Sequence, residues 1–216
     1  MVSQNARRST PHLTMASWVA VGAIALLLGP VQPAQSQRPT CSRPDTPENM
    51  AFCVNEAFTA ADAELNWVYN QVVRNLSETR RELLIDAQLD WIDHRDAACE
   101  FEVSERLGSI VPLLEIACQT RLTNVRTEEL TAYRYNHYPN GHSGDFASLE
   151  RQHRSIVNNL RGHRSTALLD ASERAWQRYR DSACGFERTG GGNAAWYNCR
   201  VRLTQQRISD LNLSAR

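Results

Sequence analysis

Residues 91–99 read WIDHRDAAC, and residues 176–184 read WQRYRDSAC. Tryptophan, an Arg–Asp pair and a cysteine therefore recur with the same spacing, 85 residues apart. A small protein seldom needs its active site twice, whereas a packed structural unit can be duplicated as a whole. We therefore interpret this pattern as part of a repeated fold.

Two further blocks extend the repeat. CQTRLTNVRTEEL begins at Cys118 and CRVRLTQQRISDL begins at Cys199, with an offset of 81 residues. VVRNL at 72–76 also resembles IVNNL at 156–160. Three blocks in one order indicate a tandem duplication. The change of offset from 85 to 81 predicts a shorter loop between the two cysteines of the second copy.

The cysteines support export and define a disulfide scheme. An even number of cysteines is typical of disulfides in an oxidising compartment, and this chain has six: Cys41, Cys53, Cys99, Cys118, Cys184 and Cys199. The second copy contains only Cys184 and Cys199, so these two pair if each copy folds by itself. By equivalence Cys99 pairs with Cys118, which leaves Cys41 for Cys53. No CxxC motif or Cys/His cluster has zinc-site spacing, so we expect no metal.

The N-terminus has the pattern of a secretory signal peptide, which we assign to residues 1–36. Two arginines precede an apolar stretch of 14 residues, Met15–Leu28, and small residues stand before a cleavage point at Gln37. The stretch is shorter than the ~20 residues that span a bilayer. We expect a periplasmic or secreted protein with no stable membrane span after cleavage; a retained N-terminal anchor is the alternative.

Charge is distributed unevenly along the chain. Residues 37–133 contain 9 arginines and 17 acidic residues, whereas residues 134–216 contain 13 arginines and 7 acidic residues. The formal net charge of zero therefore hides an acidic half and a basic half. We expect no nucleic-acid partner, because the arginines of an exported chain are here interleaved with acids.

Helical periodicity occurs in both copies. Thr46-Pro47 begins an apolar stripe with three- and four-residue steps, Thr79 with Glu82 forms a capping-box pattern before a second stripe, and Pro112 stands at the start of a third. No segment alternates with period two. The sequence predicts an all-α protein of two tandem disulfide-stapled helical units, each of about three helices.

The repeat also predicts the domain organisation. We expect a first helical domain at 37–133, a turn-rich linker at 134–147 and a second domain at 148–216. The second domain is truncated at its start, because nothing in the linker matches the first cysteine pair. We expect Gly190-Gly191-Gly192 to form a flexible loop.

No combination of residues predicts catalysis. His94 lies beside Asp93 and Asp96, but side chains adjacent in a helical sequence do not face each other, and the second copy has Tyr179 in its place. A solvated helix surface explains this cluster. With all cysteines paired no thiolate nucleophile remains, and no hydrolase or phosphate-binding motif occurs. We predict a protein that is not an enzyme and has no cofactor.

The duplicated tryptophan and Arg–Asp pair favour a structural role. Trp91 and Arg95 are four residues apart on one helix face, so the guanidinium can stack on the indole. Asp96 points elsewhere and is expected to meet Arg121 or Arg126. The complete structural motif is Trp91, Arg95, Asp96, Trp176, Arg180 and Asp181.

An acidic segment, EFEVSERLGS at 100–109, lies inside the ring that Cys99 and Cys118 would close. Glu100, Glu102 and Glu105 could steer the protein toward a basic partner. The alternative is an ordinary loop whose charges serve solubility.

The order of motifs resembles a known family. The pattern runs from a cysteine pair through ADAELNWVYNQV, AQLDWIDHRDAAC and a Gly–Ser break to CQTRLTNVRTEEL, and it resembles the LprI-type lysozyme inhibitor N-terminal domain over about 41–133. The second copy, 148–212, matches from its middle onward. It departs at three characteristic positions, where Glu150, His153 and Glu173 replace Asn66, Tyr69 and Gln88.

The resemblance implies an exported, all-helical inhibitor of lysozyme or another peptidoglycan hydrolase that acts by protein–protein contact. The glutamates of the acidic segment would meet basic groups around the lysozyme cleft, and Arg106 or Ser109 would enter it. The alternative function is a structural or stress-related envelope module without a hydrolase target.

Overall fold

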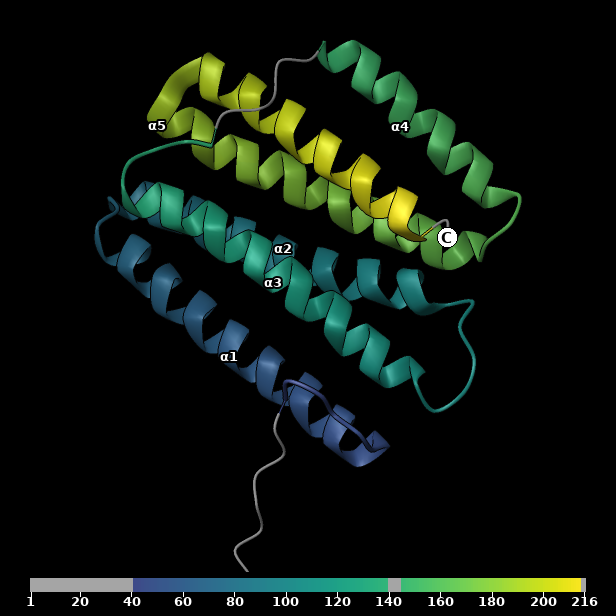
Figure 1. The fold of residues 1–216 in the computed structure, drawn as a ribbon. Helices are drawn as coiled ribbons and strands as arrows, with labels where there is room; N and C mark the ends of the chain where they lie inside the picture. The colour runs from purple at the N-terminus through teal and green to yellow at the C-terminus, as the bar shows by residue number, and fades with distance from the viewer. Residues whose placement is uncertain (1–40, 140–144, 215–216) are drawn as a thin grey trace, which may run out of the picture. The chain divides into compact units, whose positions relative to one another are not determined.

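Five helices follow one another through residues 41–139 and 145–214, the part of the chain that the computed structural model describes (Figure 1). They are α1 (Pro47–Arg74), α2 (Glu78–Val103), α3 (Val111–Arg134), α4 (Phe146–Arg161) and α5 (Thr166–Ser214). These ranges contain no strand, so the all-α prediction is confirmed. The expected signal peptide lies outside the described residues.

Two helix starts show how local sequence determines the ends of helices. At α1 the Thr46 side chain accepts a hydrogen bond from the Asn49 amide at 3.1 Å, and Pro47 follows in the first turn, as predicted. The predicted capping box at Thr79 is wrong. The connection after α1 is so short that α2 begins earlier, with Ser77 as its N-cap residue and Thr79 inside the first turn.

The triple glycine is a tight bend and not a flexible loop, because α5 continues through it. Gly192 alone leaves helical geometry, with φ 68°, and α5 folds back there as two arms, 166–191 and 193–214 (Figure 1). A Cβ atom at Gly190 would overlap the Tyr138 hydroxyl, which explains the need for glycine. The second copy therefore joins its last two helical segments without a projecting loop.

The three disulfides are those that the repeat predicts: Cys41–Cys53, Cys99–Cys118 and Cys184–Cys199. The second links α2 to α3, and the third links the two arms of α5 at the equivalent place. Because α4 has 16 residues where α1 has 28, the second copy has no counterpart of the N-terminal part of α1. The domain boundaries at 37–133 and 148–216 stay a prediction.

The two copies pack together within one compact unit, Pro39–Arg216, in which α2 runs against α5. Their contacts are reciprocal. Arg121 of the first copy pairs with Asp210 at 2.7 Å, and the equivalent Arg202 pairs with Glu129, the residue equivalent to Asp210. Contacts that repeat when the copies are exchanged define an approximate two-fold axis, as in a symmetric dimer.

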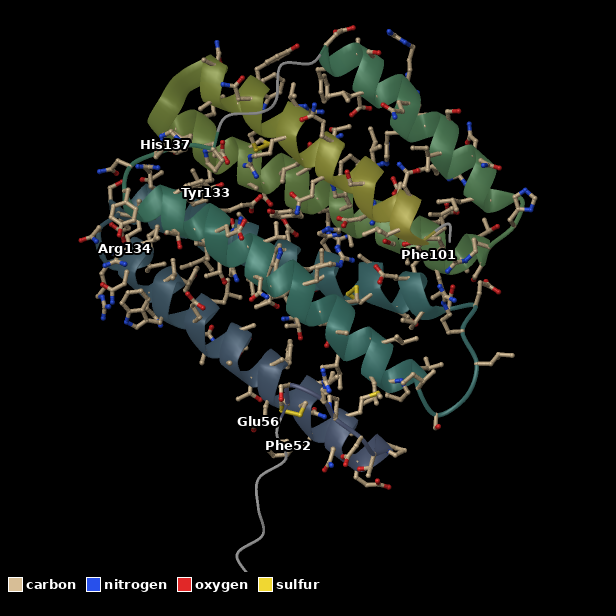
Figure 2. The ribbon with its side chains drawn as sticks, viewed as in Figure 1. Phe52, Glu56, Phe101, Tyr133, Arg134 and His137 are labelled. Carbon is tan, nitrogen blue, oxygen red and sulfur yellow. A yellow bond between two sulfur atoms is a disulfide. The ribbon has the colours of Figure 1, made fainter. Side chains whose placement is uncertain are left out.

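The hydrophobic core also crosses between the copies. One cluster joins Leu84 and Trp91 of α2 to Phe186 and Leu203 of α5. In a second cluster, Phe101 at the end of α2 packs among residues of α4 and α5 (Figure 2). Each copy therefore completes the core of the other.

Candidate functional site

The repeated Trp–Arg motif has the same geometry in both copies. The Arg95 guanidinium lies 5.2 Å from the centre of the Trp91 ring, and Arg180 lies 4.7 Å from that of Trp176. The predicted stacking is thus present twice. Trp91 and Trp176 are almost fully buried, so the motif joins helices and offers no aromatic surface to a ligand.

The expected partners of Asp96 are wrong. Asp96 pairs with its neighbour Arg95 at 2.8 Å, and Asp181 likewise pairs with Arg180 at 3.2 Å. Arg121, one of the arginines expected to meet Asp96, instead bonds Glu102 and Asp210. The reason is the rotation of α2, which turns Asp96 outward and leaves its side chain half-exposed.

His94 is not on a solvated surface, which corrects the sequence interpretation. The residue is 5% exposed, and its ring stacks on Tyr179 with centroids 5.5 Å apart and planes 9° from parallel. Tyr179 occupies the position equivalent to His94, so the two residues meet at the approximate axis. Burial, helped by the charge of Arg207, lowers the pKa of His94 to about 3. The imidazole is neutral at physiological pH.

A buried ionic network surrounds this stacked pair. Glu129 accepts hydrogen bonds from Arg126 at 3.0 Å and from the Tyr179 hydroxyl at 2.6 Å, and also pairs with Arg202. Burial by itself would raise the pKa of the Glu129 carboxyl. The positive charges of Arg202 and Arg126 have the larger effect, so the pKa is lowered overall. Glu129 therefore carries a compensated charge inside the protein.

A second carboxylate of the network is held differently. The Tyr133 hydroxyl donates a hydrogen bond to Glu187 at 2.5 Å, and Arg202 contacts the same oxygen at 2.6 Å. Burial raises the pKa of Glu187 in spite of the Arg202 charge. A raised carboxyl pKa also occurs in general acids, but Glu187 is fully buried and no substrate can touch it. The network joins the copies.

The acidic segment is mostly engaged within the molecule. Because α2 extends to Val103, Glu100 and Glu102 belong to its last turns and not to a loop. Glu102 pairs with Arg121 at 2.7 Å, and Glu105 accepts a hydrogen bond from the Ser165 amide at 3.3 Å. Of the three glutamates, only Glu100 is exposed without a partner among the described residues.

The α2–α3 loop, residues 104–110, projects from this end of the first copy. Arg106 and Ser109 are exposed, as an insertion into a cleft requires. Between them Leu107 is 90% exposed, and Gly108 has a φ of 91° that suits glycine. The sequence analysis did not identify Leu107, although an apolar residue next to a loop glycine can indicate an exposed contact residue.

A hollow of about 500 Å³ lies beside this loop. Its walls include Arg106 of the loop, Leu114 of α3 and Leu213 near the end of α5. The leucines are partly exposed, at 38% and 46%. The loop and the hollow together form an apolar surface with a basic edge, which can bind another protein.

The family model described as Lysozyme inhibitor LprI matches residues 41–130 and again residues 145–211. The chain belongs to the LprI lysozyme inhibitor family. The two matched segments correspond to the two copies of the repeat, as the resemblance predicts.

Two individual proteins are also similar to this LprI-family chain. Uncharacterized protein R02472 of Rhizobium meliloti (strain 1021) is 36% identical over 127 residues, which cover 51% of this chain and 91% of that protein. The crystal structure of an uncharacterised protein from Burkholderia thailandensis has a TM-score of 0.58 at 15% identity, covering 84% of this chain and 91% of the other. The second likeness supports the fold alone.

Residues that depart from the family pattern in the second copy gather in one place. Glu150, His153 and Glu173 line a hollow of about 260 Å³ between α4 and α5. Glu173 lies 3.0 Å from His153 and 2.8 Å from Arg207. Burial raises the pKa of Glu173, but His153 and Arg207 outweigh burial and lower it. The three substituted residues therefore form their own internal contacts in the second copy, and these contacts keep the Glu173 carboxylate ionised.

Metal clusters and membrane-spanning helices are both absent from the described part of the chain. Among residues 41–139 and 145–214, no group of three or more His, Cys, Asp or Glu side chains could hold a metal ion. None of the described helices is both long enough and apolar enough to cross a membrane.

Proposed function

We propose that this protein is an extracytoplasmic, non-enzymatic inhibitor of a lysozyme or another peptidoglycan hydrolase, acting by protein–protein contact. Its family membership over both copies carries the proposal. Three disulfides suit an oxidising compartment. Export through residues 1–36 and a periplasmic or secreted location are part of the proposal.

The inhibitory element in this proposal is the α2–α3 loop. The Cys99–Cys118 bridge closes the ring that contains it, so part of the ordering cost is met before binding. A lysozyme cleft works through two carboxylates, which a basic side chain can approach. Arg106 would meet that charge, Leu107 would fill an apolar subsite, and Ser109 would contact the wall.

The glutamates have different roles in this arrangement. Glu102 and Glu105 hold the base of the loop through Arg121 and Ser165. Glu100 is free to meet basic groups at the rim of the cleft. The sequence alone suggested that all three glutamates face the partner. In this proposal only Glu100 does.

The test is a lysis assay on peptidoglycan with a basic c-type lysozyme and the mature chain, residues 37–216. We expect concentration-dependent inhibition and an increase of at least tenfold in the half-inhibitory concentration for Arg106→Ala/Leu107→Ala. Arg188→Ala/Thr189→Ala, near the bend of the second copy, is the matched control and should inhibit like the unchanged chain. Circular dichroism should show that both variants fold.

Two outcomes would contradict the proposal. Lysis unaffected at every concentration of the mature chain would favour the structural or stress-related envelope module. Equal inhibition by the loop variant and the unchanged chain would remove the loop from the mechanism.

A further inference from the structure

The outer face of α2 carries an exposed apolar stripe. Ile85, Leu89 and Ile92 are 39%, 58% and 36% exposed. Their spacing of four and then three residues aligns them on one side of the helix. This side is opposite the one that packs against α5, where Ala87, Trp91 and His94 are buried. The stripe is therefore an unpartnered helix face and not part of the core.

Acidic residues border the stripe along its whole length. Six lie on the same side of α2 by helical spacing: Glu78, Glu82, Asp86, Asp93, Asp96 and Glu100. Asp93 pairs with Arg178 and Asp96 with Arg95. The other four are exposed and form no ion pair within the described residues. We call these acids and the apolar stripe the outer face of α2.

The second copy shows that the fold does not require this surface. In the first arm of α5, the positions equivalent to Ile85, Leu89 and Ile92 are occupied by polar side chains: Asp170, Arg174 and Gln177. Those equivalent to the six acids are occupied by His163, Ala167, Ala171, Arg178, Asp181 and Gly185. Equivalent helices of the same repeated fold thus carry an acidic and apolar face in the first copy and a polar, nearly neutral face in the second.

We infer that the outer face of α2 binds the basic surface of the hydrolase, beside an apolar patch on that partner. The inference rests on the proposed function and extends it from the loop to the helix. Unpaired acids around an apolar stripe complement a basic protein and disfavour an acidic one. Glu100 lies in the last turn of α2, which ends at Val103 where the α2–α3 loop begins, so helix and loop can contact one partner together.

The dimensions suit such an interface. From Glu78 to Glu100 the helix is about 33 Å long at 1.5 Å per residue. A protein–protein interface of standard size buries about 800 Å² on each partner. Each side of such an interface contributes roughly 20–30 residues. The loop supplies residues 104–110, and the outer face of α2 extends this set along the helix.

The electrostatic part is tested with Glu78→Gln/Glu82→Gln/Asp86→Asn in the mature chain. Association with a basic c-type lysozyme, measured by surface plasmon resonance, should slow about tenfold at low salt and less than twofold at high salt, because salt screens exposed charges. The matched control removes three exposed acids elsewhere, in Glu56→Gln/Glu64→Gln/Glu128→Gln. It has the same net charge and should change the rate less than threefold.

The apolar part is tested with Leu89→Ser. The dissociation constant should rise about tenfold through faster dissociation, since an exposed leucine adds stability only after the complex forms. Arg174→Ser changes the equivalent position of the second copy and should leave the constant unchanged.

Binding and lysis are measured on the same samples so that the two proposals can fail separately. If the mature chain inhibits lysis but the α2 variants bind like their controls, the inference is wrong and the proposed function stands. If the chain binds through the outer face without inhibiting, the proposed function is wrong and the inference stands. If the chain does not bind the lysozyme, both are wrong.

Discussion

The two copies of the repeat share a frame but present different surfaces. The first copy links its last two helices by a projecting loop with Leu107 90% exposed, whereas the second turns at Gly192 with Gly190 against Tyr138. The outer face of α2 is acidic and apolar, and its counterpart on α5 is polar. The shared parts are the disulfide, the stacked Trp–Arg pair and the reciprocal ion pairs. In the proposed function, the first copy binds the partner and the second copy supports it.

The largest expected difference between equivalent positions concerns Glu129 and Asp210. Glu129→Ala would leave buried Arg126 and partly buried Arg202 without their shared carboxylate, at a cost of about 3–5 kcal/mol. Asp210→Ala breaks one pair with a partly exposed Arg121 and should cost about 1 kcal/mol or less. Urea unfolding at pH 7 measures both. Equal losses of stability in the two variants would contradict the prediction that Glu129 contributes more than Asp210 to the contact between the copies.

A smaller effect is expected from pH through His94. Its pKa is about 3 in the folded protein and its usual value is 6.5, so the unfolded chain binds the extra proton between these values. The contribution of His94 to the free energy of unfolding is present above pH 6.5 and is lost as pH decreases. The free energy of unfolding should therefore fall by about 2 kcal/mol from pH 7 to pH 5. The lowered pKa values of Glu129 and Glu173 act in the same direction at lower pH.

The His94→Gln variant isolates this contribution. Glu187, whose pKa is raised, acts with opposite sign, because its folded-state proton is lost as pH rises. It is present in both proteins, so the difference between their pH dependences reports His94. Chemical unfolding at pH 5, 6 and 7 should show a weaker dependence in the variant. Parallel curves would mean that His94 does not control acid stability.

The smallest expected difference concerns the Asp of the repeated motif. Among the described residues Asp96 pairs with Arg95 alone, whereas Asp181 contacts both Arg180 at 3.2 Å and Arg200 at 3.0 Å. Both carboxylates are half-exposed, so neither contact is strong. We expect Asp96→Ala to cost a few tenths of a kcal/mol and Asp181→Ala about 0.5–1 kcal/mol. Thermal unfolding of the two variants measures the order, and a reversed order would show that Arg200 adds nothing.

Much of the fold could be predicted because it is repeated in the sequence. The recurring cysteine spacing determined all three disulfides, and apolar periodicity indicated the helices. The rotation of α2 about its axis could not be predicted from local sequence, and it separates exposed Asp96 from buried His94. A signal for His94 did exist, because Tyr179 at the equivalent position is aromatic and suits a buried contact.

The candidate site was predicted less completely. A Gly–Ser break and two flanking cysteines placed the loop, and Arg106 and Ser109 are exposed there. The engagement of Glu105 by Ser165 depends on how the copies pack, which the sequence does not state. Leu89 on the outer face of α2 was overlooked because an apolar residue with helical spacing usually belongs to a core. The polar Arg174 at the equivalent position was the available signal.

Carboxyl footprinting of the mature chain, with and without a basic c-type lysozyme, tests most directly the claim that the first copy carries the binding surface. The account predicts protection of Glu78, Glu82, Asp86 and Glu100 in the complex. Asp170, on the equivalent face of the second copy, should be labelled equally in both samples. Protection of Asp170, or no protection along α2, would contradict the account.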